Sequence, residues 1–187
     1  MADQGSEGLL SSFLRRQRIR AAAPYLRGRV LDFGCGSGSL ASFIDPDHYS
    51  GVDIDAEVIE LARRRNPKHA FEIAQLPHGR QFDTIVSLAV IEHVPDPAAF
   101  LAGALPLLAP GGSIVLTTPH PNYRGVHDFG ARLGLFSRAA SEEHQTLLDG
   151  RAMRRLAISC GLSIVLYRRF LFGANQLYVL QPGIQSP

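Results

Sequence analysis

The feature that most constrains the fold of this chain is a glycine-rich stretch at residues 30–40, which reads VLDFGCGSGSL. Its first four residues are typical of a buried strand, and Gly34, Gly36 and Gly38 then follow at every second position. Glycine suits a tight turn of this kind because it adopts backbone conformations closed to other residues and lets a ligand approach without meeting a Cβ atom. The apolar pattern then resumes at helical spacing, which predicts a helix start whose unpaired N–H groups face a nucleotide-like ligand.

An acidic residue follows at the spacing that such a ligand needs. A second strand, residues 49–52, ends in Asp53, where a dinucleotide-type fold places the acidic residue that accepts the ribose hydroxyls. The glycine turn reads GxGxG, which differs from the GxGxxG of nicotinamide and flavin enzymes, and it lacks the Lys-Ser/Thr pair that holds a triphosphate.

Strands and helices alternate along the rest of the chain. This alternation predicts a single α/β domain with a mostly parallel sheet, helices on both faces and a ligand at the carboxyl ends of the strands. The last two strands are so close in sequence that only antiparallel pairing fits. The expected strands are residues 30–33, 49–52, 70–74, 82–88, 113–118, 162–170 and 174–180, and the expected helices are residues 9–23, 39–44, 56–65, 97–108 and 150–160. Residues 119–147 are too long for a simple connection and form a candidate lid.

Hydrophobic periodicity also predicts which side chains are buried. The expected buried stripe of the helix at 56–65 is Val58, Leu61 and Ala62, and in the third strand Phe71 and Ile73 are expected to face inward.

The helix in the N-terminal segment, residues 1–26, is amphipathic. Leu9, Leu10, Phe13 and Leu14 form its apolar face, while four arginines crowd the rest. One interpretation is a surface helix that packs on the fold with solvated arginines. The other is a basic helix that makes peripheral contact with a membrane or an anionic substrate.

Composition excludes several classes of protein. Hydrophobic residues make up 45% and charged residues 19%, which is typical of a globular domain, and a net charge of +2 gives no reason to expect nucleic acid as a partner. The two cysteines have no metal-ligand spacing. The first residues lack the basic region of a secretory signal and no apolar run approaches a membrane span, so a cytoplasmic location is expected.

Four motifs in order identify a family resemblance. They are the glycine turn, GVDID at 51–55, FDTIVSLAVIEHVPDP at 82–97 and LLAPGGSIVLTTP at 107–119. Together they resemble the class I S-adenosylmethionine (SAM)-dependent methyltransferases, especially small-molecule enzymes of the quinone-biosynthesis and sugar/lipid type. The resemblance implies one Rossmann-like methyltransferase domain over residues 1–187, with a seven-stranded sheet, an antiparallel last strand and SAM as the cofactor.

The same resemblance implies roles for particular residues. The glycine turn would line the methionine end of SAM, Asp53 would accept the ribose hydroxyls and Ile54 would pack on the adenine. Asp32 would orient the amino group or simply hold the turn. Relatives place an Asp after the third strand to bind the adenine amino group; here Glu72, Gln75 or the backbone alone takes that role. The implied cofactor-binding residues are Asp32, Gly34, Cys35, Gly36, Ser37, Gly38, Asp53, Ile54, Gln75, Leu76, Ser87 and Leu88.

Methyl transfer from a sulfonium needs in-line positioning, exclusion of water and, for a protonated acceptor, a base. No metal is required, and none is expected. The candidate bases are His93, His120 and His144, because the pKa of histidine lies near neutral pH. His93 is equally well interpreted as a packing residue beneath the cofactor.

The acceptor is expected to be a small molecule that is methylated at oxygen. The segment after the fourth strand lacks the Asn/Asp-Pro-Pro-aromatic loop of enzymes that methylate base amines of nucleic acids. Tyr123, Arg124, Phe129 and Arg132 are candidates for a wall that contacts an anionic acceptor, or for a lid that packs on itself.

Two other functions remain open alternatives at this point. One is a SAM-binding protein without catalysis. The other is a nicotinamide-dependent oxidoreductase, which the GxGxG turn and the absence of a Tyr-x-x-x-Lys pair disfavour, Lys68 being the only lysine. A monomer or a homodimer is expected.

Overall fold

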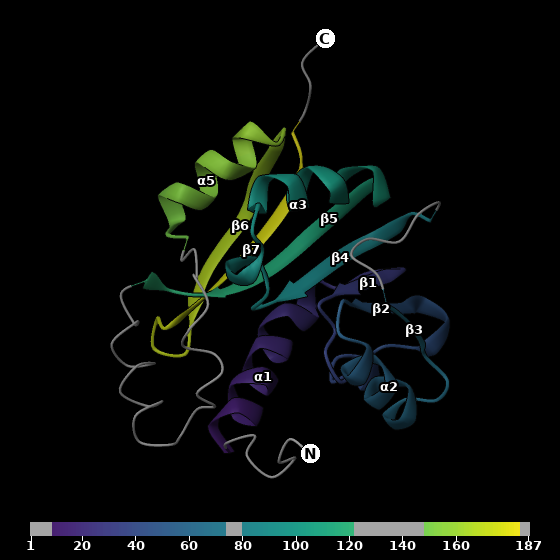
Figure 1. The fold of residues 1–187 in the computed structure, drawn as a ribbon. Helices are drawn as coiled ribbons and strands as arrows, with labels where there is room; N and C mark the ends of the chain where they lie inside the picture. Colours follow the sequence, from purple (N-terminus) through teal and green to yellow (C-terminus); the bar gives the residue numbers. More distant parts are fainter. Residues whose placement is uncertain (1–8, 74–79, 122–147, 184–187) are drawn as a thin grey trace.

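The computed structural model describes residues 9–73, 80–121 and 148–183, which form a seven-stranded sheet in the order β3-β2-β1-β4-β5-β7-β6 (Figure 1). The pairs β1–β2, β2–β3, β1–β4 and β4–β5 are parallel, whereas β7 runs antiparallel to both β5 and β6. The strands are β1 Val30–Phe33, β2 Tyr49–Asp53, β3 Ala70–Ile73, β4 Phe82–Leu88, β5 Leu108–Pro119, β6 Leu162–Phe170 and β7 Asn175–Pro182. The predicted fold class is therefore confirmed.

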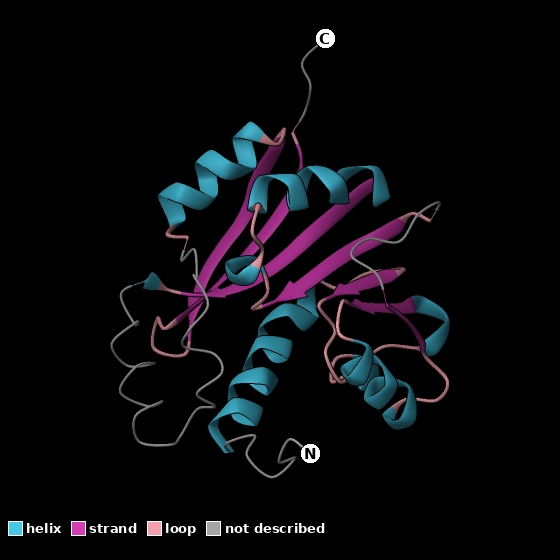
Figure 2. Ribbon diagram, in the orientation of Figure 1, coloured by secondary structure: helices cyan, strands magenta, loops and turns pink. Residues whose placement is uncertain are grey.

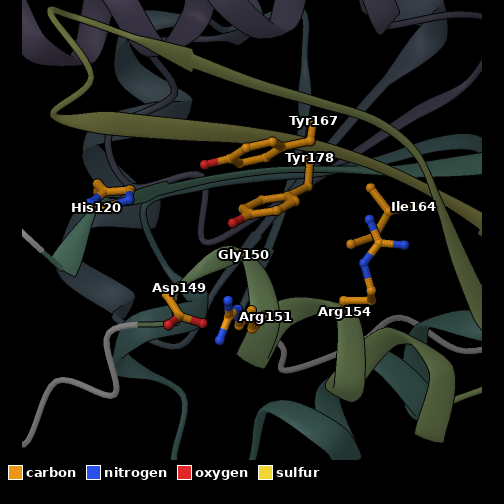
Figure 3. Close-up of a pocket in the computed structure, with 8 residues that line it drawn as sticks. All are labelled: His120, Asp149, Gly150, Arg151, Arg154, Ile164, Tyr167 and Tyr178. Atoms are coloured by element: carbon orange, nitrogen blue, oxygen red, sulfur yellow. The ribbon is translucent and has the colours of Figure 1, made fainter.

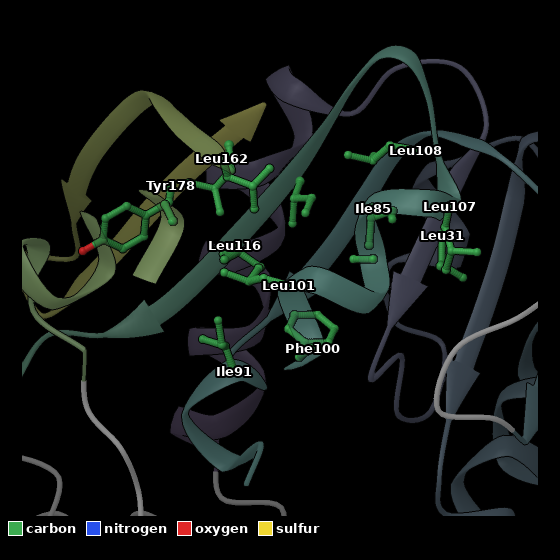
Figure 4. Close-up of a cluster of buried hydrophobic side chains, with 14 of the residues drawn as sticks. Leu31, Ile85, Ile91, Phe100, Leu101, Leu107, Leu108, Leu116, Leu162 and Tyr178 are labelled. Carbon is green, nitrogen blue, oxygen red and sulfur yellow. The ribbon is translucent and has the colours of Figure 1, made fainter. Parts of the chain in front are cut away.

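Helices cover both faces of the sheet (Figure 2). On one face lie α1 (Leu9–Ala22) and α2 (Ala56–Arg65), and on the other lie α3 (Pro97–Ala104) and α5 (Gly150–Ser159). Each layer has its own buried cluster, because successive side chains of a strand point to opposite faces. Leu31, Ile85 and Leu116 pack toward α3 and α5 (Figure 4), whereas Val30, Val86 and Val115 pack toward α1 and α2.

Aspartate side chains begin the helices where the sequence predicts them. Asp55 accepts hydrogen bonds from the backbone N–H groups of Glu57 and Val58, Asp96 from Ala98 and Ala99, and Asp149 from Ala152. A carboxylate at this position satisfies N–H groups that have no partner within the helix.

The predicted helix at residues 39–44 is wrong. Only a 3-10 turn, Ala41–Phe43, forms there, and a second 3-10 turn begins at Pro46. The chain between Gly38 and Pro46 is too short for an α-helix of ordinary length. No α-helix N-terminus therefore meets a ligand at the glycine turn, and the backbone of the turn itself presents the N–H groups.

The C-terminal end of the fourth predicted helix is also different. The α-helix stops at Ala104, and a 3-10 turn, Leu105–Leu107, follows because Pro106 cannot donate a helical hydrogen bond. The next strand then starts at Leu108, earlier than predicted, and its pairing with β4 shifts register between Phe82 and Thr84.

Burial corrects three local predictions. In α2 the fully buried residues are Ile59 and Ala62, so the helix is rotated relative to the predicted stripe. Ile73 is 54% exposed because it ends the edge strand β3. In α1, Phe13 is 47% exposed and Ile19 makes the buried contact.

One arginine of α1 is not solvated as predicted. The Nε atom of Arg18 donates to Oδ1 of Asn175 in β7, at 3.1 Å, and burial lowers the pKa of its guanidinium. This contact attaches α1 to the first residue of β7. None of the described helices combines the length and the apolar character that crossing a bilayer requires.

Candidate ligand-binding site

The glycine loop, residues 34–38, joins β1 to the following turns at the carboxyl edge of the sheet. The N–H groups of Gly34 and Cys35 both donate to the carbonyl oxygen of Val52, at 2.9 and 3.0 Å. The N–H of Gly36 donates to Oδ2 of Asp53 at 2.9 Å, and Oδ1 of Asp53 accepts from the N–H of Asp55 at 3.1 Å. The Asp53 carboxylate is therefore held in one orientation beside the loop.

The three glycines of the loop meet different constraints, although all have positive φ angles. A Cβ atom on Gly34 would lie 2.5 Å from Val90, and one on Gly38 would lie 2.7 Å from Asn66. A Cβ atom on Gly36 would meet nothing within 4 Å. Gly34 and Gly38 are thus required by packing, whereas Gly36 presents bare backbone to open space.

Side chains from two helices brace the loop. Arg65 of α2 donates to the hydroxyl oxygen of Ser37 at 2.8 Å, and the amide of Asn66 donates to the carbonyl oxygen of Gly38 at 3.2 Å. From α1, Arg15 donates to the hydroxyl oxygen of Ser39 at 3.3 Å. The loop is held in place by the fold.

Two exposed apolar side chains flank Asp53. Ile54 follows Asp53 in the chain and is 72% exposed. Ile73 is the register partner of Asp53 in β3 and is 54% exposed. Together they offer exposed apolar surface beside the Asp53 carboxylate, on which a flat ring could pack. Sequence reasoning predicted Ile73 to be buried and so missed it; only the position of β3 at the sheet edge reveals it.

The residues that follow β3 are only partly described. The Glu72 carboxylate is exposed and lies 3.7 Å from the Arg80 guanidinium. Gln75 and Leu76 lie outside the described residues.

Asp32 lies below the glycine loop and is 3% exposed. Its Oδ2 accepts a hydrogen bond from the Tyr49 hydroxyl at 2.8 Å. Burial raises the pKa of Asp32 to about 7, the bond from Tyr49 opposes that rise, and the charge of Asp53 adds to it. Sequence reasoning missed Tyr49, whose partner becomes evident only when the register pairs Val30 with Tyr49.

Asp32 makes the stability of the protein depend on pH. Because its pKa is about 7 in the folded state against 3.8 for the ordinary group, folding retains a proton that the unfolded chain releases. Stability is therefore highest below the unfolded pKa and falls as pH rises toward 7. We expect the unfolding free energy of the wild type to fall between pH 5 and 8 by on the order of 3 kcal/mol more than that of Asp32→Asn.

Urea titrations at several pH values measure this difference. Tyr49→Phe is the companion variant, because removal of the hydroxyl raises the pKa of Asp32 further and moves the fall to higher pH. Parallel pH profiles for the wild type and Asp32→Asn would show that Asp32 ionises normally.

The carboxyl end of β4 carries a second group of predicted residues. Ser87 is fully buried and its hydroxyl has no hydrogen-bond partner among the described residues, while Leu88 is half-buried. In the following 3-10 turn, Ile91–His93, Glu92 is buried and His93 is exposed. Burial raises the pKa of Glu92, and the positive charge of Arg18 opposes this.

His120 comes directly after β5 and lines a cavity of about 480 Å³ (Figure 3). Its backbone N–H donates to the carbonyl oxygen of Ala174 at 2.8 Å. Burial and the nearby Arg169 lower the pKa of its imidazole, and Asp149 opposes this. The neutral imidazole is thus favoured, which is the form that accepts a proton. The cavity is lined by His120, Asp149, Gly150, Arg151, Arg154, Ile164, Tyr167 and Tyr178.

A buried glutamine supports this cavity. The Gln176 amide nitrogen donates to the carbonyl oxygens of Pro119 and Leu148, at 3.2 and 2.9 Å, and its oxygen accepts from the Tyr178 hydroxyl at 2.6 Å. Sequence reasoning identified neither this residue nor the arginines of α5, because only the folded sheet brings the β6–β7 hairpin against α5.

The structure brings the glycine loop, Asp53, Ile54, Ser87, Leu88, His93 and His120 to the carboxyl edge of β1, β2, β4 and β5. Both cysteines are free thiols. His144 and the predicted wall, Tyr123, Arg124, Phe129 and Arg132, lie outside the described residues. Within the described parts of the chain, no three His, Cys, Asp or Glu side chains gather in a way that would hold a metal ion.

A family model with the description "Methyltransferase domain" matches residues 8–167. The ubiquinone biosynthesis O-methyltransferase of Aromatoleum aromaticum is 32% identical over 111 residues, which cover 51% of this chain and 46% of that protein. The protein of the same name from Psychrobacter arcticus is 34% identical over 130 residues, 62% of this chain and 51% of that protein. The chain thus spans about half the length of these relatives.

Solved structures share the fold at low sequence identity. Magnesium protoporphyrin IX methyltransferase from Synechocystis PCC 6803, solved with bound S-adenosylhomocysteine (SAH), superposes with a TM-score of 0.69 at 18% identity, over 95% of this chain and 89% of that one. An S-adenosylmethionine-dependent methyltransferase from Mesorhizobium loti gives a TM-score of 0.69 at 19% identity, over 89% of this chain and 97% of that one.

Proposed function

The chain belongs to the family of methyltransferase domains whose model covers residues 8–167, and from this premise we propose that it transfers a methyl group from SAM to a hydroxyl oxygen of a small molecule. The observation that carries the proposal is the glycine loop with Asp53 fixed beside it by the Gly36 N–H. The open space over Gly36 allows a ligand to lie directly on the loop backbone.

The described residues fit this cofactor at three points. Asp53 supplies a carboxylate for the ribose hydroxyls, and such hydrogen bonds to a charged acceptor are strong. Ile54 and Ile73 supply exposed apolar surface for the adenine ring on either side of that carboxylate. The loop admits the methionine end at Gly36, where no side chain intervenes.

When bound, SAM supplies a methyl group on a positively charged sulfur, which becomes a neutral thioether after transfer. The C–S bond breaks as the C–O bond to the acceptor forms, and the hydroxyl proton must leave. His120 accepts that proton in our proposal, because its lowered pKa keeps the imidazole neutral. The fold contributes in-line positioning and exclusion of water, and no metal takes part.

Methylation at oxygen is favoured over methylation at nitrogen because the two relatives described above, at 32% and 34% identity, are named as O-methyltransferases. The match covers only about half the length of these relatives, so the acceptor is identified by experiment and not from their names.

Calorimetric titration of the purified chain tests the cofactor. We expect SAM and SAH to bind with micromolar affinity and NADH not to bind. Binding of NADH alone would instead support a nicotinamide-dependent oxidoreductase. Incubation with SAM and a panel of phenols, catechols and sugars then tests catalysis, with SAH formation as the readout. Cofactor binding with no turnover on any acceptor would favour a SAM-binding protein without catalysis.

A further inference from the structure

The cavity between α5 and the β6–β7 hairpin has an aromatic side and a cationic side (Figure 3). Tyr167 and Tyr178 lie side by side with ring centroids 5.0 Å apart. Both rings line the cavity; Tyr178 is fully buried, whereas Tyr167 is 45% exposed and has the more accessible ring. A ring of this kind is a surface on which a flat ligand packs well.

Arg151 and Arg154 provide the cationic side, on the first turn and a half of α5. Both are exposed, and within the described parts of the chain neither forms an ion pair with a carboxylate. The cavity also contains Asp149, but its carboxylate accepts the Ala152 N–H at 2.7 Å as the helix cap. The lining therefore carries two guanidinium groups against one carboxylate that already has a partner.

We infer that this cavity binds an acidic group, a carboxylate or a phosphate, carried on a planar ring of the acceptor. The inference rests on the proposed function and deepens it, because it names the chemistry of the acceptor. Guanidinium groups recognise both anions through paired N–H donors, and the Tyr167 ring contacts the planar part of the same molecule.

The position of the cavity agrees with a role in holding the acceptor. His120 belongs to its lining and ends β5, which is separated from β1 by β4 alone. Neighbouring strands lie about 4.8 Å apart, so His120 is about 10 Å from β1 across the sheet, and it also lies three residues, about 10 Å, beyond the level of Gly34 along the strand direction. An acceptor that lies between the loop and this cavity would have its hydroxyl on the side of β4 and its charge at α5.

Protein-observed NMR with SAH present tests the inference with four probes: benzoate, phenyl phosphate, inorganic phosphate and neutral benzyl alcohol. We expect the three anions to shift resonances of His120, Arg151, Arg154 and Tyr167, with phenyl phosphate binding more tightly than phosphate. Arg151→Gln and Arg154→Gln should each lower the affinity for phenyl phosphate about tenfold. Arg20→Gln is the matched control, because Arg20 is an exposed helical arginine of α1 that does not line the cavity.

Equal binding of benzoate and benzyl alcohol would overturn the inference, and so would equal losses in all three arginine variants. Absence of shifts at these residues with every anion up to millimolar concentration would overturn it as well. A preference for inorganic phosphate over phenyl phosphate would retain the anion site but refute the planar acceptor. SAH binding is measured on the same samples, so failure of the proposed cofactor is distinguished from failure of this site.

Discussion

Replacement of Asp53 by alanine is expected to weaken SAH binding by at least about 100-fold. The carboxylate holds the Gly36 N–H and the Asp55 N–H, and we propose that it also accepts the ribose hydroxyls. Each hydrogen bond to a charged group contributes about 1.5–3 kcal/mol, so two lost bonds account for the effect. Asp53→Asn retains one acceptor oxygen, so its affinity for SAH is expected to lie between those of the wild type and the alanine variant.

Calorimetry with SAH measures the loss, and Asp96→Ala is the matched control. Asp96 also accepts two backbone N–H groups, those of Ala98 and Ala99, but these belong to the first turn of α3 and not to the glycine loop. The two variants should lose similar stability, and only Asp53→Ala should lose affinity. An affinity within threefold of the wild type in Asp53→Ala would contradict the role given to this carboxylate.

The second large effect is expected at Gly36. Alanine at Gly36 and alanine at Gly111 impose the same kind of backbone strain, because the two φ angles are +50° and +78° and neither Cβ atom would meet anything within 4 Å. Each change should cost about 1–2 kcal/mol of stability. Only Gly36→Ala should reduce SAH affinity, by about 30-fold or more, because its methyl group occupies the ligand's side of the loop.

Urea unfolding and calorimetry on both variants separate the two effects. Gly34→Ala completes the series. It adds a clash with Val90 to the same backbone strain, so we expect this variant to be less stable than the Gly36→Ala and Gly111→Ala variants. Equal SAH affinity in the Gly36 and Gly111 variants would mean that the cofactor does not lie on the loop.

The sequence was most informative where a local signal determines the structure. The glycine turn, Asp53 and the helix-capping aspartates are recognisable because each acts on residues only a few positions away or at a fixed spacing along a strand-turn-strand unit. For a local reason too, the helix predicted at residues 39–44 does not form. The apolar spacing that suggested it does not say whether the few residues before Pro46 can form an α-helix or only a 3-10 turn.

The site residues that could not be predicted depend on contacts between distant segments. The Tyr49 hydroxyl meets Asp32, 17 positions earlier, only through strand register. Tyr167 comes to the first turn of α5 only because β6 pairs beyond β7, and no spacing in the sequence encodes that meeting. The cytoplasmic location, the oligomeric state and a membrane contact of α1 stay predictions.

Gln176 fixes the two ends of the segment between Pro119 and Leu148. Its single amide nitrogen holds the carbonyl of Pro119, where the chain leaves the sheet, and that of Leu148, where it returns. The anchor points of the intervening stretch are thus fixed to each other independently of its length or composition. We therefore expect that a stretch of different length can be placed between these two carbonyls while the glycine loop and Asp53 keep their geometry.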